Sequence, residues 1–140
     1  MKILAFTDFH GNEEAYRRAK ELAADEKPDL LIVAGDIINY DFNRAKQHLS
    51  DLASGGRPVY FVPGNMDSEE LGGWAGAENI HALHGRCEYS EEDAARLLEA
   101  AAKDCRGDRL ILASHCPPKN TKVDQLASGE HAKHIGTKFR

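Results

Sequence analysis

The chain lacks the features that would place it in a membrane, on a nucleic acid or outside the cell. No apolar run in its 140 residues approaches the roughly 18 residues of a transmembrane helix. Its 18 Lys and Arg against 23 Asp and Glu give a net charge of −5, so it has no excess of basic residues for a nucleic-acid polymer. Its three cysteines form no Cys-x-x-Cys pair, which is typical of reduced thiols. Asp8 interrupts the apolar N-terminal segment, which argues against a signal peptide. We therefore expect a cytoplasmic protein with no membrane or nucleic-acid partner.

Several catalytic motifs are also missing. A cysteine phosphatase needs Cys-x5-Arg, but Asp93, Ile111 and Lys122 stand where the arginine would follow each cysteine. No Gly-x4-Gly-Lys-Ser/Thr loop is present, which excludes a P-loop nucleotidase. No strand is followed by Gly-x-Gly-x-x-Gly, which argues against a dinucleotide-binding fold.

The patterning of apolar residues predicts an α/β protein. A chain of 140 residues is one domain by the usual size range, so we expect a single domain over residues 1–140. Apolar runs, capping residues and turn residues predict strands at 2–7, 30–34, 58–63, 79–84 and 109–114, and helices at 13–26, 41–53, 68–75 and 90–104. Strands that alternate with helices favour a parallel sheet.

Polar side chains follow four of the predicted strands. Asp8 and His10 come after the first, Asp36 after the second, Asn65 after the third and His115 after the last. Asp8 and Asp36 are 28 residues apart, and Asp36 and Asn65 are 29 apart. A strand–helix–strand unit takes about 30 residues, so the polar side chains recur once per unit. Parallel strands bring such residues to one edge of the sheet.

These residue types suit a pair of divalent metal ions. Two ions about 3.5–4 Å apart can clamp the attacking and leaving oxygens of a phosphoryl transfer. Asp36, central in the order, is the natural bridging carboxylate. Asp8 and His10 are two positions apart, and in an extended segment both would leave the same face and reach one ion. Asn65 and His115 offer an oxygen and an imidazole to the second ion. Mixed nitrogen and oxygen ligands without thiolate favour Mn, Fe, Ni or Zn over Ca.

The segments Asp8-Phe9-His10, Gly35-Asp36, Gly64-Asn65-Met66-Asp67 and Ser114-His115 resemble four of the five sequence blocks of the calcineurin-like metallophosphoesterases. Their order and spacing are most similar to the small bacterial and archaeal phosphodiesterase-like branch. The resemblance implies a layered α/β sandwich of two sheets and hydrolysis by a metal-bound hydroxide at a dinuclear centre.

The same resemblance implies roles for individual residues. Asp8 and His10 would hold the first metal, Asp36 would bridge, and Asn65 and His115 would hold the second. Asp36, Asn65 and Asp67 are the expected catalytic residues. We expect two divalent ions, with Mn ahead of Fe, Ni or Zn, and a small phosphate-ester substrate, a diester ahead of a monoester.

Two departures from the family pattern affect what can be carried over. Met66 stands where the family has a histidine that contacts the phosphate or protonates the leaving group, and methionine can do neither. The terminal strand and Gly-His-x-His block, which supply one ligand to each metal, are absent from the 140 residues. The stretch 86–90 is also short, so we expect the second sheet to be incomplete.

Other readings of these residues remain open at the level of sequence. Asp-x-His, Gly-Asp and Gly-Asn are each common by chance or as turns, and only their joint order after apolar strands favours a metal site. We interpret His48 as a solvated surface residue and Trp74 as a packing residue. An alternative to an enzyme is a catalytically weak or inactive interaction module on the same fold. The five retained ligands favour the enzyme.

Overall fold

The structure is a computed structural model and describes residues 1–83, 103 and 111–116. The chain divides into two compact units, Met1–Cys87 and Glu88–Arg140. The helices and strands whose bounds follow all belong to the first unit. The single domain over residues 1–140 stays a prediction.

The first unit alternates strands and helices as the sequence predicts. Its elements in chain order are β1 (Ile3–Phe6), α1 (Glu13–Glu26), β2 (Leu30–Ala34), α2 (Phe42–Ala53), β3 (Val59–Val62), α3 (Glu69–Gly73), β4 (Gly76–Ala77) and β5 (Ile80–Ala82). The helices begin at the predicted caps. The side chains of Asn12, Asp41 and Ser68 accept hydrogen bonds from backbone N–H groups three residues later, which caps the first turn of each helix.

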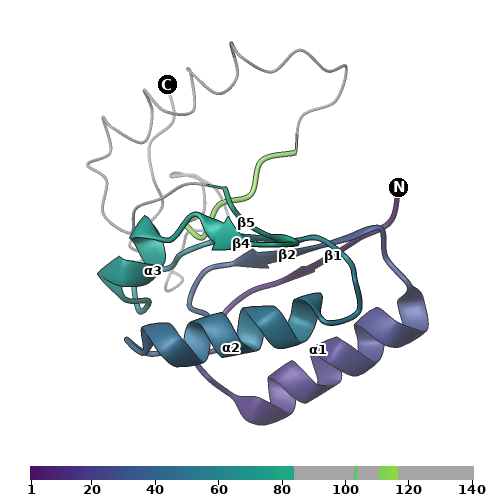
Figure 1. The fold of residues 1–140 in the computed structure, drawn as a ribbon, viewed down its shortest axis with the longest axis horizontal. Helices are drawn as coiled ribbons and strands as arrows, with labels where there is room; N and C mark the ends of the chain where they lie inside the picture. The colour runs from purple at the N-terminus through teal and green to yellow at the C-terminus, as the bar shows by residue number, and fades with distance from the viewer. Residues whose placement is uncertain (84–102, 104–110, 117–140) are drawn as a thin grey trace, which may run out of the picture. The chain divides into compact units, whose positions relative to one another are not determined.

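The strands form one sheet in the order β1-β2-β3-β5-β4. The pairs β1–β2, β2–β3 and β3–β5 are parallel, and β4 pairs antiparallel with β5. Phe6 is opposite Val33, and Ala34 is opposite Val62, so the first three strands end at the same edge of the sheet. Helices α1 and α2 lie side by side along one face of the sheet (Figure 1). The predicted α/β class is confirmed.

The core lies between the sheet and these helices. Leu31, Val33, Val59 and Phe61 of the central strands are fully buried, and Leu49 of α2 packs against the same cluster. Trp74 packs against this core as predicted, with its ring 5.6 Å from that of Phe61. Burial of these aliphatic and aromatic side chains therefore holds the strands in position and determines where their ends lie.

The structure differs from the predicted elements in two respects, apart from element ends that shift by one or two residues. Residues 111–114 of the strand predicted at 109–114 are not in a strand, and Ile111 and Leu112 are more than half exposed. Strand composition alone does not make a strand, because a strand also needs a neighbouring strand to pair with. The two-residue strand β4 is missing from the prediction because Gly76-Ala77 has no strand pattern. The helix predicted at 90–104 lies outside the described residues except for Lys103, which is helical. Among the described residues no helix is long and apolar enough to cross a membrane.

Candidate metal centre

The loops that follow β1 and β2 are joined by a short ladder of backbone hydrogen bonds. The N–H of Asp8 donates to the carbonyl of Gly35 at 3.1 Å, and the N–H of His10 donates to the carbonyl of Asp36 at 2.7 Å. These bonds continue the parallel pairing beyond the ends of the strands. They place three polar side chains, those of Asp8, His10 and Asp36, on neighbouring turns of backbone.

These three side chains form a cluster in which the potential ligand atoms all lie within 4.8 Å of one another. The Nε2 atom of His10 is 3.8 Å from Oδ1 of Asp8 and 3.5 Å from Oδ2 of Asp36. Asp36 is buried, while Asp8 and His10 are exposed. The cluster is thus open to solvent on one side and anchored in the protein on the other.

All three residues have a left-handed backbone conformation. The φ angles are 56° for Asp8, 48° for His10 and 50° for Asp36. A residue with a Cβ adopts this conformation at a cost of about 1–2 kcal/mol. The expected geometry, an extended segment that sends Asp8 and His10 to one face, is therefore wrong. The two side chains meet because the backbone turns at each of them. Residues with strained backbone conformations cluster at active sites and ligand-binding sites, so their presence together indicates a functional site.

The second nitrogen of His10 explains the orientation of its ring. Nδ1 lies 3.2 Å from Oδ1 of Asn39, an oxygen that can only accept, so this contact requires the proton on Nδ1. The other ring nitrogen, Nε2, faces the carboxylates of Asp8 and Asp36, so a cation between these three groups would have a nitrogen and two oxygens as ligands. Metal-binding histidines commonly donate their other N–H to such a partner. The donor set therefore fits a divalent metal. Sequence reasoning missed Asn39, whose only signal is a polar residue four positions from Gly35.

The loop after β3 packs directly against Asp36. The backbone N–H of Met66 donates to Oδ1 of Asp36 at 2.9 Å. A Cβ added to Gly64 would lie 2.2 Å from the backbone nitrogen of Asp36, so only glycine permits this approach. Asn65 stands between these two contacts and is exposed. Asn65 therefore lies between two residues that approach Asp36, and its role as a metal ligand stays a prediction.

Asp67 clamps two of the loops together. Its carboxylate accepts hydrogen bonds from the N–H groups of Gly64 at 2.8 Å, Ile38 at 2.9 Å and Ile37 at 3.2 Å. Burial raises the pKa of Asp67, the three N–H groups lower it, and the charge of Asp36 raises it further. Asp67 was predicted to be catalytic. These contacts favour a positioning role, in which it fixes the loops that carry Asp36 and Asn65.

The side chain of Met66 turns toward Tyr40. The Tyr40 hydroxyl lies 3.5 Å from the Met66 sulfur, and the Tyr40 N–H donates to the Met66 carbonyl at 2.9 Å. The Met66 side chain itself cannot replace the family histidine as a proton donor, because the sulfur of methionine is only a weak acceptor.

His115 belongs to the second unit. It is partly buried and precedes Cys116, whose carbonyl accepts a hydrogen bond from Ser114 at 2.8 Å. Cys116 is a free and exposed thiol. The predicted role of His115 as a ligand of the second ion stays a prediction.

The model of a family described as calcineurin-like phosphoesterase matches residues 1–138. No curated protein matches the chain.

Proposed function

The chain belongs to the calcineurin-like phosphoesterase family, and we propose that it is a phosphodiesterase that hydrolyses a small phosphodiester with two divalent metal ions. Metal-dependent hydrolysis of phosphate esters is the general chemistry of this family. The observation that supports the proposal best is the cluster of Asp8, His10 and Asp36 at the end of β1 and β2. The match over residues 1–138 agrees with the resemblance that the sequence motifs indicated.

The proposed ligands divide between two ions. Asp8 and His10 would hold the first, Asp36 would bridge, and Asn65 with His115 would hold the second. Mn is our first expectation for both, because mixed nitrogen and oxygen ligands without thiolate suit Mn, Fe, Ni and Zn. When bound, such ions supply an activated water and offset negative charge on the phosphate.

The protein's own residues would hold this centre in place. The N–H of Met66 fixes one oxygen of Asp36, which leaves the other toward His10. Asn39 orients the ring of His10, and the hydroxyl of Thr7 lies 2.5 Å from one oxygen of Asp8. Each proposed ligand of the first ion thus has a second contact that sets its direction.

The alternative is a non-catalytic interaction module on the same fold. Met66 favours this alternative, because a methionine in place of the family histidine cannot protonate a leaving group. The two proposals share the metal cluster but differ in turnover. An enzyme hydrolyses an activated diester when metal is present, and a module binds metal without hydrolysis.

The test measures metal content and hydrolysis together. Purified protein is analysed for bound metal and assayed on bis(p-nitrophenyl) phosphate with and without Mn²⁺. We expect Mn²⁺-dependent hydrolysis in the wild type. Asp36→Asn should lose more metal than Asp8→Asn, because a bridging ligand serves both ions. Asp51→Asn, which changes a partly buried carboxylate of α2 outside the metal cluster, is the matched control.

The outcomes separate the proposals. Metal binding without hydrolysis of the activated diester supports the module. Equal metal content in Asp36→Asn and the wild type contradicts the bridging role of Asp36. Loss of metal in Asp51→Asn would show that the assay reports general destabilisation.

A further inference from the structure

Tyr16 of α1 is a buried tyrosine that contacts both loops of the metal cluster. Its ring stacks on Phe9, with centroids 4.1 Å apart and planes inclined by 23°. Its hydroxyl donates to the carbonyl of Ile37 at 2.9 Å. Burial raises the pKa of the Tyr16 phenol above its usual range, so the hydroxyl keeps its proton and remains a donor.

Both contact partners of Tyr16 are neighbours of proposed ligands. Phe9 stands between Asp8 and His10, and Ile37 follows Asp36 directly. The three proposed ligands have left-handed backbones, and such conformations persist only where the surrounding structure holds them. Tyr16 therefore contacts the loop after β1 through its ring, which stacks on Phe9, and the loop after β2 through its hydroxyl, which donates to Ile37.

The opposite face of the Tyr16 ring is covered by His48 of α2. The two rings are 3.8 Å apart and nearly parallel, at 4°. Nε2 of His48 is buried and makes no hydrogen bond among the described residues, although Oε1 of Glu13 lies 3.5 Å away. A buried polar atom without a hydrogen bond costs free energy. The His48 ring stacks on Tyr16 instead of forming a hydrogen bond through this nitrogen.

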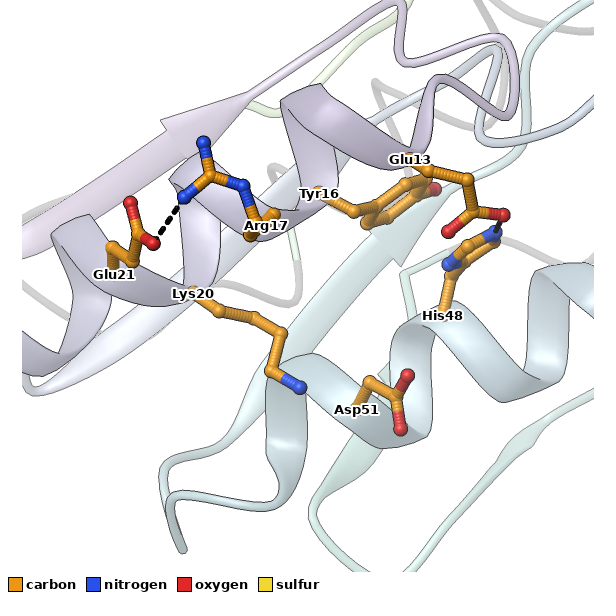
Figure 2. A pocket seen from close by; sticks show the side chains of 7 residues that line it. All are labelled: Glu13, Tyr16, Arg17, Lys20, Glu21, His48 and Asp51. Atoms are coloured by element: carbon orange, nitrogen blue, oxygen red, sulfur yellow. Dashed lines mark hydrogen bonds and ion pairs between the residues drawn. The ribbon is translucent and has the colours of Figure 1, made fainter.

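His48 forms the outer end of this stack. Tyr16 and His48 line a groove of about 300 Å³ between α1 and α2. Figure 2 shows the two rings facing each other, with Glu13 at the edge of the His48 ring. The series Phe9, Tyr16 and His48 therefore runs from the metal cluster to the groove between the helices.

We propose that Tyr16 is a positioning residue for the first metal ion, acting through Phe9 and Ile37, and that His48 supports it from the other face. This inference rests on the proposed function, because it takes Asp8, His10 and Asp36 to be ligands. Neither Tyr16 nor His48 touches the ion. They hold the two loops at the separation that metal binding requires.

The test measures the affinity of Tyr16→Phe for Mn²⁺ by isothermal titration calorimetry. The phenylalanine keeps the ring stack and removes only the hydroxyl. We expect Mn²⁺ binding to weaken by about tenfold, the lower end of what the loss of an outer partner costs a metal site. The Mn²⁺ concentration that half-activates hydrolysis should rise by the same factor, with kcat at saturating Mn²⁺ close to that of the wild type.

Tyr60→Phe is the matched control, because the ring of Tyr60 on β3 packs at a tilt against His81, and no contact with a residue of the metal cluster is seen in the described part of the chain. It should bind Mn²⁺ as the wild type does. A purely structural role for Tyr16 would lower the melting temperature of the metal-free protein and leave Mn²⁺ affinity unchanged, and that result would overturn the inference.

The His48 arm of the inference has its own pair of variants. His48→Ala removes the ring that backs Tyr16 and should weaken Mn²⁺ binding roughly threefold, in line with the modest strength of one aromatic contact. His48→Phe restores a ring and should restore the affinity. Equal affinities in both variants contradict the supporting role of His48.

The wild type and Asp8→Asn separate this inference from the proposed function. If the wild type binds no Mn²⁺, or if Asp8→Asn binds it equally well, the proposed metal site fails and the inference fails with it. If those two proteins differ as expected while Tyr16→Phe matches the wild type, only the inference fails.

Discussion

At the scale of single residues, the proposed ligands depend on neighbours that the family motifs do not include. Asn39 orients the His10 ring, and the Met66 N–H fixes Asp36. Sequence motifs identified Asp8, His10 and Asp36 because their order after apolar strands is unusual. They could not identify Asn39 or Tyr16, because those contacts arise from how the backbone turns and how α1 packs.

The methionine at position 66 leads to a prediction about leaving groups. Bis(p-nitrophenyl) phosphate should be cleaved much faster than glycerol phosphate, because p-nitrophenolate leaves without a proton and an alkoxide does not. Met66→His should raise turnover of glycerol phosphate by roughly a hundredfold, the lower end of the range for general acid catalysis. Steady-state kinetics of both proteins on both substrates measure this.

Met66→Leu is the control for that substitution. It keeps an apolar side chain of similar size beside Tyr40 and should leave the substrate preference unchanged. If glycerol phosphate and the activated diester react equally fast in the wild type, or if Met66→His changes neither rate, the missing histidine does not determine the preference.

At the scale of elements, the first unit follows its sequence closely. Helix α1 begins and ends at the predicted residues, and β2 has the predicted bounds. Capping residues and continuous apolar runs are local signals, so they can be read without knowing the fold. His48 shows where this fails. Lys46 and Gln47 beside it suggested a surface position, but His48 is only 6% exposed because α1 covers that side of α2.

Two elements depend on contacts that no local pattern records. β4 is a two-residue strand formed by pairing with β5. The segment 111–114 has strand composition but is not in a strand. Whether a segment forms a strand depends on pairing as well as on composition, so composition alone predicts both segments wrongly.

The turn after β3 gives a prediction about packing between elements. A Cβ at Gly64 would lie 2.2 Å from the backbone nitrogen of Asp36 and 2.3 Å from its Oδ1. Gly64→Ala should therefore push the loops of β2 and β3 apart and destabilise the protein by about 1–3 kcal/mol, the usual range for overpacking. It should also weaken Mn²⁺ binding, because Asp36 moves.

Gly73→Ala is the matched control for Gly64→Ala. A Cβ at Gly73 in α3 meets nothing within 4 Å, so this variant should be as stable as the wild type or slightly more so. Urea denaturation of the three proteins measures the difference. Equal midpoints for Gly64→Ala and Gly73→Ala would show that the contact with Asp36 relaxes without cost.

At the scale of the whole molecule, the free energy of unfolding should depend on pH through the titration of His48. Burial lowers the pKa of His48 from 6.5, the charge of Arg44 lowers it further, and the charges of Glu13 and Asp51 raise it. These charged groups belong to the two helices that pack around the ring, Glu13 to α1 and Arg44 and Asp51 to α2. The folded protein therefore binds a proton at His48 less readily than the unfolded chain does.

The direction of the pH dependence follows from linkage. Above pH 6.5 His48 is neutral in both states, so its titration does not change the free energy of unfolding. As the pH falls through 6.5 the unfolded chain binds a proton that the folded protein does not, so the free energy of unfolding decreases. The decrease continues until the pH reaches the lowered pKa of the folded state.

His48→Phe keeps the stack on Tyr16 and removes the titration. Between pH 7.5 and pH 5 it should therefore lose less stability than the wild type in urea denaturation. His81→Phe replaces an exposed histidine of β5 and should behave as the wild type does. Carboxylates titrate in all three proteins, so only the difference between them reports on His48. If the wild type and His48→Phe lose equal stability, pairing with Glu13 compensates for the burial of the ring.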